Sequence, residues 1–141
     1  STVVGLSMFG VDGRYNIANF QLRGQYIYAG LSNVAAYNQF TGSDLGSAML
    51  GWYAEAAYSF YFGNEASKKL TPFVRCEKYD THSKVSGSTV RNAAYNRIDV
   101  TLGASLELSR GAVLKADYQW FGNAAETAYK KQLNLGIGIW F

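Results

Sequence analysis

The chain has 141 residues, of which 48% are hydrophobic, 16% aromatic and only 16% charged, with a formal net charge of +3. The length suits a single domain, residues 1–141, and so small and scattered a charge gives no reason to expect a nucleic-acid partner. No run approaches the roughly 18 apolar residues of a membrane-spanning helix, which excludes a helical membrane protein. Low charge together with 11 Tyr, 8 Phe and 3 Trp suits a transmembrane β-barrel, which carries aromatic girdles at both lipid interfaces.

Apolar and polar side chains alternate along most of the chain and predict seven antiparallel strands, because successive side chains of a strand point to opposite faces. In chain order, the predicted strands are residues 3–15, 20–31, 49–62, 70–81, 95–108, 112–121 and 131–141. Short turns are expected at 16–19, 63–69 and 109–111, and longer polar loops at 32–47, 82–93 and 122–129. Lys78 breaks the alternation, so we expect a bulge or the edge of the bilayer there.

The last predicted strand reads K-Q-L-N-L-G-I-G-I-W-F, with one wholly apolar face. This ending resembles the terminal strand of bacterial outer-membrane β-barrels, whose final aromatic and spaced apolar residues are read by the insertion machinery. The resemblance implies that Gly136, Ile139 and Phe141 form an assembly signal, and that outer-membrane lipid and the barrel-insertion machinery are partners. The last strand of a soluble sheet also alternates, so that alternative stays open.

Short and long connections alternate along the chain, which predicts on which side of the membrane each connection of such a barrel lies. Outer-membrane barrels have short periplasmic turns and longer extracellular loops. The turns near Ala18, Glu65 and Arg110 are then periplasmic, and the loops near Phe40, Ser86 and Asn123 are extracellular.

Seven strands are an awkward number, because single-chain bacterial barrels have even strand counts as a rule. An unpaired first strand would also leave backbone groups bare in lipid, at several kcal/mol per group. We therefore expect the carboxy-terminal portion of a larger barrel. Because no signal peptide precedes Ser1, a mature, trimmed or partial chain is expected. The alternative is a missed strand within 32–47 and a complete eight-stranded barrel.

The polar face of the predicted strands carries most of the charge, and we predict that it lines a water-filled pore. The predicted pore-lining residues are Arg14, Arg23, Glu55, Arg75, Glu77, Arg97, Asp99, Glu107, Lys115 and Asp117, with Asp12 as a further acid on this face. Neighbouring strands are expected to pair Arg75 or Arg97 with these acids. Stabilising charge ladders and a pore lining are compatible interpretations.

Periodicity alone does not decide which face meets lipid, since a soluble lipocalin-like barrel would carry the same pattern turned inside out. The length of the strands, with aromatic residues near both ends, favours a bilayer.

A family resemblance appears in residues 70–81, which read L-T-P-F-V-R-C-E-K-Y-D-T. This segment resembles the P-F-V-R-Y-E-x-Y-D stretch of porins related to the phosphate-selective porin O and P family. Residues 51–55, 114–119 and 133–141 resemble late strands of that family in the same order, so the similarity spans most of the chain from about Val11. Cys76 replaces the usual Tyr, on the outward face.

The resemblance implies a parent porin of roughly sixteen strands, trimeric, in the outer membrane of a Gram-negative bacterium, that passes anions or other small hydrophilic solutes by diffusion. It implies no cofactor. The basic ladder behind phosphate selectivity is not recognisable here, because inward acids balance inward bases.

Catalysis and metal binding find little support in the sequence, and we expect neither. The only histidine, His82, lies beside Asp80 and Ser83 near a predicted loop, and a solvated loop histidine is the default interpretation. One His and one distant Cys give no metal-ligand spacing, and a single cysteine forms no intrachain disulfide. The two glycines at 136 and 138 lie in a strand and form no nucleotide-binding motif.

Three functions therefore remain. The first is a passive diffusion porin. The second is a structural outer-membrane barrel that scaffolds, or is plugged by, a partner protein. The third is a soluble β-barrel that binds a ligand.

Overall fold

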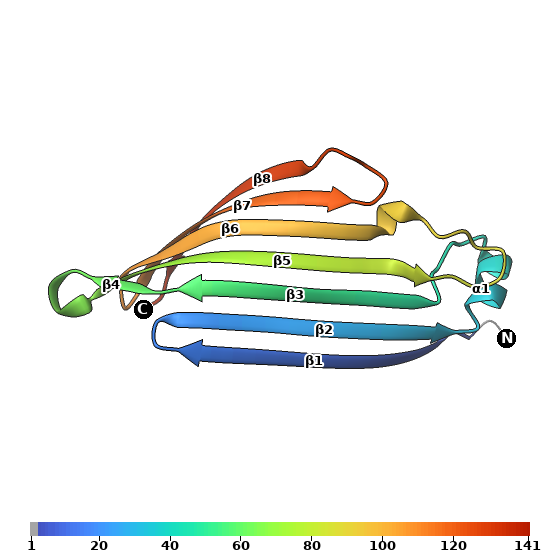
Figure 1. Ribbon diagram of the computed structural model, residues 1–141, viewed down its shortest axis with the longest axis horizontal. Helices are drawn as coiled ribbons and strands as arrows, with labels where there is room; N and C mark the ends of the chain where they lie inside the picture. Colours follow the sequence, from blue (N-terminus) through green and yellow to red (C-terminus); the bar gives the residue numbers. More distant parts are fainter. Residues whose placement is uncertain (1–2) are drawn as a thin grey trace.

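The computed structural model describes residues 3–141 and contains one antiparallel sheet of eight strands with little helix (Figure 1). The strands are β1 (Gly5–Ile17), β2 (Phe20–Ser32), β3 (Ala48–Tyr58), β4 (Phe60–Phe62), β5 (Lys68–Lys84), β6 (Asn96–Ser109), β7 (Ala112–Asn123) and β8 (Lys130–Ile139). They pair in the order β1-β2-β3-β5-β6-β7-β8, and the short β4 continues the line of β3 and pairs with β5. The all-β antiparallel prediction is confirmed.

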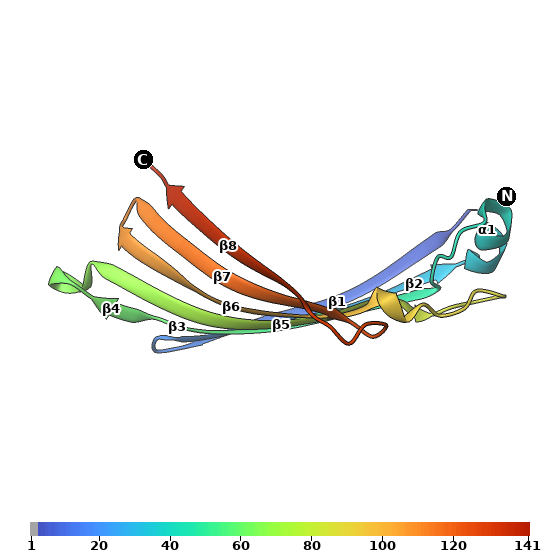
Figure 2. The ribbon, with the colours of Figure 1, turned by 90° about the horizontal axis from the view of Figure 1, so that it is seen from above.

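The sheet is open at both edges. Within residues 3–141, β1 pairs only with β2, and β8 pairs only with β7. Seen from above, the strands bow and the sheet twists between these two edges (Figure 2), as the right-handed twist of individual strands requires. One edge of β1 and one edge of β8 therefore present backbone donors and acceptors that no described strand satisfies.

The connections gather by length at the two ends of the sheet (Figure 1). At one end lie the short turns 18–19, 63–67 and 110–111; at the other lie the longer segments 33–47, 85–95 and 124–129. In the turn between β1 and β2, Ala18 has a φ of 49°, a left-handed conformation of the kind that two-residue hairpin turns require. The predicted alternation of turns and loops along the chain is confirmed.

The segment 32–47 contains the helix α1 (Val34–Thr41) and no strand, so the alternative of a hidden strand there is wrong. Asn33 and Gly42 flank the helix in left-handed conformations, with φ of 59° and 68°. The segment Val34–Thr41 contains alanines and side-chain amides, and its apolar residues do not recur every second position. Such a pattern favours a helical turn over a strand. Short 3-10 turns lie at Asn64–Ala66 and Ala93–Tyr95.

The bulge expected at Lys78 is absent from that position. Lys78 pairs in register with Trp52 of β3 and Ile98 of β6. The irregularity in the β3–β5 ladder lies further on, between Ala48 and Leu50 of β3, where β5 runs from Asp80 to Lys84. At this point β3 begins at the loop end of the sheet, where the Ser47 N–H donates to the Lys84 carbonyl at 2.8 Å.

Apolar residues form almost no core. Within residues 3–141, the buried hydrophobic side chains are Ala29, Val34, Ala48 and Ala57. Most of the large apolar side chains lie exposed on one face of the sheet. The stabilising contacts of this chain are therefore those of the strand ladder and of the polar side chains described next.

Candidate functional site: the polar face of the sheet

All ten predicted pore-lining residues share one face of the sheet. The register connects Arg14, Arg23, Glu55, Arg75 and Thr101 as successive cross-strand partners in one row. Because side chains alternate along a strand, the other predicted residues, at even spacing from this row on their own strands, face the same way. We refer to this surface as the polar face and to the opposite one as the apolar face.

An ion ladder crosses β2, β3 and β5 on the polar face. Arg23 Nε lies 3.4 Å from Glu55 Oε1, and Arg75 Nη1 lies 3.7 Å from Glu55 Oε2. Arg75 Nη2 also donates to Glu77 Oε1 at 2.6 Å, while its guanidinium stacks 4.0 Å from the ring of Tyr53. The predicted pairing of Arg75 with acids is confirmed. Arg75 binds two carboxylates and an aromatic face, which fixes its position.

The other charges of the face are less evenly matched. Arg97 forms no ion pair within 4 Å among residues 3–141, so its predicted pairing is not observed. Lys69 Nζ lies 2.6 Å from Glu107 Oε2 near the turn end. Arg14 faces Arg23 directly across β1 and β2, and such like-charged neighbours repel.

A second network, made of amides, a hydroxyl and the Asp117 carboxylate, continues the polar face to β8. Asn134 Nδ2 donates to Asp117 Oδ1 at 2.7 Å and to Gln119 Oε1 at 3.0 Å. Gln119 Nε2 in turn donates to Thr101 Oγ1 at 3.3 Å. Lys115 also lies on this face, opposite Ser105 and Gly136. Sequence reasoning passed over these amides and the hydroxyl, which only the register brings together.

The two faces differ sharply in exposure. Thr101 is 5% exposed and Asp99 is 7% exposed on the polar face, whereas Leu102 is 55% and Leu135 is 76% exposed on the apolar face. Side chains converge on the concave side of a curved sheet and spread on the convex side. The burial difference thus indicates that the polar face is the concave one.

A compact polar cluster lies at the loop end and holds the segment 85–95 against β5. His82 is 3% exposed, and both nitrogens of its ring are engaged. The Asn92 backbone N–H donates to Nδ1 at 3.1 Å, and Nε2 contacts the backbone carbonyl of Asp44. Nδ1 therefore carries the lone pair and Nε2 the proton. The ring also packs edge-on against Tyr95, with centroids 4.5 Å apart.

Asp80 and Arg91 complete this cluster. Asp80 Oδ1 accepts the backbone N–H of His82 at 2.9 Å, and its Oδ2 forms an ion pair with the Arg91 guanidinium. Arg91 Nε also donates to the carbonyl of His82 at 3.0 Å. Ser83 makes no hydrogen bond to the His82 ring among residues 3–141. The geometry of His82 is that of a residue fixing a loop, and its nitrogens do not face a substrate cleft.

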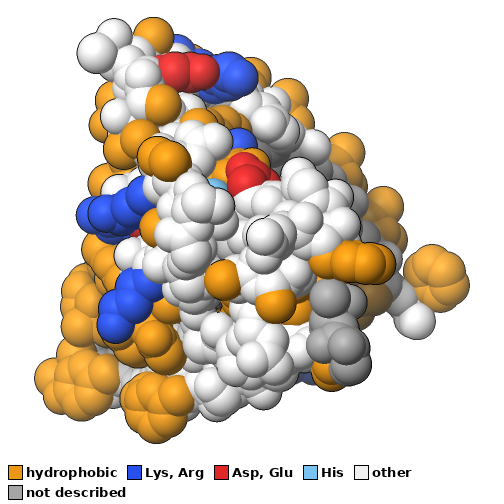
Figure 3. Space-filling model, turned by 90° about the vertical axis from the view of Figure 1, so that its right-hand side faces the viewer, with side chains coloured by type: hydrophobic (Ala, Val, Ile, Leu, Met, Phe, Trp, Pro, Cys, Tyr) orange, Lys and Arg blue, Asp and Glu red, His pale blue; other side chains and the backbone are white. Residues whose placement is uncertain are grey.

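Asn38 of α1 joins the remaining loops at this end. Its amide nitrogen donates to the Leu45 carbonyl at 2.8 Å and to Thr89 Oγ1 at 3.1 Å, and its oxygen accepts the Leu45 N–H at 3.0 Å. Figure 3 looks onto this end, where uncharged polar side chains and backbone fill the centre and hydrophobic side chains lie around the margin.

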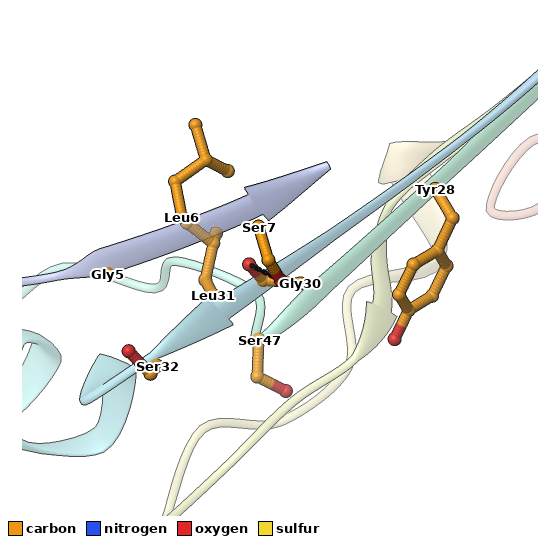
Figure 4. Close-up of a pocket in the computed structure, with 8 residues that line it drawn as sticks. All are labelled: Gly5, Leu6, Ser7, Tyr28, Gly30, Leu31, Ser32 and Ser47. Carbon is orange, nitrogen blue, oxygen red and sulfur yellow. Dashed lines mark hydrogen bonds between the residues drawn. The ribbon is translucent and has the colours of Figure 1, made fainter. Parts of the chain in front are cut away.

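A shallow groove lies where β1 begins and β2 ends (Figure 4). Ser7 Oγ donates to the Gly30 carbonyl at 3.3 Å, and Tyr28 and Ser47 line the far side. None of the side chains that line the groove is charged, and the phenol of Tyr28 is the one ionisable group among them. It offers no nucleophile–base pair and no set of metal ligands.

The residues of the predicted assembly signal lie at the end of the chain. Gly136 is in β8, Ile139 ends that strand, and Phe141 follows it, fully exposed. The Trp140 N–H donates to the Gly111 carbonyl at 3.0 Å, which ties the end to the β6–β7 turn. Cys76 lies half-buried on the apolar face, opposite Ala54 and Val100.

Comparison with protein-family models, curated proteins and solved structures found no match. The family resemblance therefore stays a prediction that depends on the segments quoted above. Within residues 3–141, none of the helices has the length and apolar character needed to cross a membrane.

Proposed function

We propose that this chain forms part of the wall of an outer-membrane β-barrel porin, with the apolar face toward lipid and the polar face toward a water-filled lumen. The observation that carries the proposal is the inverted burial of the sheet. Large aliphatic side chains such as Leu102 and Leu135 stand exposed, while the carboxylate of Asp99 is buried. Lipid is the solvent in which such an apolar surface is stable, and a charge there costs about 2–4 kcal/mol at the midplane.

Strand length supports the same proposal. The seven long strands have 10 to 17 residues each. A tilted transmembrane strand needs roughly 9–11 residues, so each of them reaches across the hydrocarbon layer. The three short turns at one end are then periplasmic and the longer loops extracellular.

The open edges of β1 and β8 require partners in such a setting, because bare backbone groups cost several kcal/mol each in lipid. We propose that further strands close the barrel, to a total of roughly sixteen, as the family resemblance implies. A trimer in the outer membrane is part of the same proposal.

Planar-bilayer recording of the full-length protein tests the transport function. We expect discrete conductance steps, and we expect Arg75→Glu and Arg97→Glu to shift the reversal potential toward cations, since both guanidiniums would line the lumen. Arg110→Glu, in the β6–β7 turn, is the matched control and is expected to leave selectivity nearly unchanged. A protein that inserts but gives no conductance step contradicts the proposal.

The second candidate is a structural barrel that scaffolds or is plugged by a partner protein. It is favoured by the self-contained ion ladder, in which Arg23, Glu55, Arg75 and Glu77 bind one another. Inserted protein without solute flux, and with a partner that copurifies at fixed stoichiometry, would support this candidate over diffusion.

A further inference from the structure

Two lysines stand on the apolar face of the sheet. Lys78 of β5 pairs with Trp52 of β3 and with Ile98 of β6. Lys131 of β8 pairs with Trp120 of β7. Directly paired side chains lie on the same face of a sheet, so both lysines share the face of these apolar partners. Both are exposed, and neither forms an ion pair within 4 Å among residues 3–141.

The acids of the sheet offer these lysines no counter-charge. With one exception, the carboxylates of the described strands lie on the polar face. The exception, Asp80, lies opposite Leu50 and is already bound by Arg91. A charge on a lipid-facing surface is costly unless it reaches the interface or an ion of opposite sign. The two lysines are therefore suited to an anionic partner from outside the protein.

Both lysines lie toward the loop end, among aromatic residues. Lys131 is the second residue of β8, which begins at that end. Lys78 lies in one cross-strand row with Tyr26 and Trp52. On the surface of this end, basic side chains stand beside hydrophobic ones (Figure 3). Tyr and Trp gather where a spanning strand meets the lipid headgroups, and a lysine there lays its stem along apolar surface and its ammonium group among the headgroups.

An apolar hollow of about 340 Å³ lies on the same face, lined by Val100, Trp120 and Tyr129. The Tyr129 ring packs directly on Gly122, where a Cβ would come within 2.5 Å of it. The Trp120 ring is held edge-on by Tyr118, with centroids 4.7 Å apart. The hollow thus has fixed aromatic and aliphatic walls, which suit an acyl chain, and the lysine of β8 stands next to it.

We propose that this part of the apolar face binds an anionic lipid through its phosphate headgroup and one acyl chain. Lys131 binds the phosphate, and the chain lies in the hollow against Trp120. Lys78, three strands away on the same face, adds a second positive charge that favours anionic headgroups. Each lysine at a membrane surface raises the affinity for anionic lipid by about fivefold. The inference relies on the proposed function for the orientation of the apolar face toward lipid.

The test is quenching of Trp120 fluorescence by lipids with brominated acyl chains, with the full-length protein in phosphatidylcholine vesicles. The Trp120 signal is the emission that Trp120→Phe removes. We expect brominated phosphatidylglycerol, which is anionic, to reach half-maximal quenching at a mole fraction about fivefold lower than brominated phosphatidylcholine. Lys131→Gln should abolish most of this preference, Lys78→Gln should reduce it less, and high salt should weaken it. Quenching of each variant by brominated phosphatidylcholine verifies that the variant has inserted.

Lys130→Gln is the matched control, because Lys130 precedes Lys131 on β8 and pairs with Phe121 on the polar face. It is expected to retain the preference for phosphatidylglycerol. Equal quenching by the two lipids, or a preference that survives Lys131→Gln, overturns the site. A Trp120 signal that neither lipid quenches would show that protein covers this face, and it also overturns the site. Conductance without a lipid preference would refute the lipid site alone, and a lipid preference without conductance would refute the transport function alone.

Discussion

Two neighbouring residues of β6 summarise the contrast between the faces of the sheet. Thr101 is polar and almost completely buried, and Leu102 is apolar and more than half exposed. In a protein that folds in water this order is reversed, because burying apolar surface is the main favourable term. The comparison teaches that the cohesion of this chain lies in the strand ladder and in polar contacts, and that most large apolar side chains stay exposed, a surface that the proposed lipid environment would cover.

The largest expected effect comes from placing a charge on the apolar face. Leu102→Arg should make folding into lipid less favourable by about 2–4 kcal/mol, seen as a large loss of folding yield in lipid vesicles. Gln119→Arg, at the same height on the polar face, is the control and should retain most of the yield. Equal losses in both variants would contradict the difference between the faces.

A smaller effect is expected from breaking the ion ladder of the polar face. Glu55 lies between Arg23 and Arg75 and is mostly buried, with its side chain 16% exposed. Glu55→Gln leaves two guanidiniums with one counter-charge fewer, and we expect a loss of about 1–3 kcal/mol in urea unfolding. Glu65→Gln, in an exposed turn, should change stability little. If Glu55→Gln leaves the free energy of unfolding unchanged, the ion ladder makes no net contribution to stability.

The loop-end cluster predicts a local effect. His82→Ala removes the acceptor for the Asn92 N–H and the contact with the Asp44 carbonyl. We expect faster proteolysis within residues 85–95, with little change in global unfolding, because the strand ladder stays intact. Ser83→Ala, on the next residue of β5, is the control. Unchanged cleavage in His82→Ala would show that other contacts hold the loop.

The smallest effect concerns pH. The Tyr95 phenol donates to Asp44 Oδ2 at 3.2 Å, and this hydrogen bond raises the pKa of Tyr95 above its ordinary value of 10.0. The stabilisation is therefore fully present below pH 10 and is lost as the pH rises through the higher folded pKa. In a tyrosinate absorbance titration, Asp44→Asn should lower the pKa of one tyrosine. An unchanged titration would contradict the contact.

Six of the seven strands could be predicted from the sequence to within three residues, because alternation is a local property that the ladder then enforces. The predicted strand 49–62 is divided at Ser59 into β3 and β4. The charged face was predictable from the same alternation. The helix α1 was not, since its residues lack a clear period and its ends depend on left-handed conformations at Asn33 and Gly42.

Contacts that depend on strand register or on distant loops could not be predicted from the sequence. Asp44 lies 38 residues from His82, and only the folded loops bring its carbonyl to the ring. The juxtaposition of Glu77 and Asp99 likewise requires the β5–β6 register, which a shift of one residue would abolish.

The orientation of the two faces is tested most directly by spin labels at Leu102 and Gln119 in a Cys76→Ala background, with the full-length protein in lipid vesicles. These positions lie at nearly the same height on opposite faces of β6 and β7. We predict that a lipid-soluble quencher relaxes the label at Leu102 and that a water-soluble quencher relaxes the label at Gln119. The reverse assignment, or equal access of the water-soluble quencher to both labels, would contradict the account.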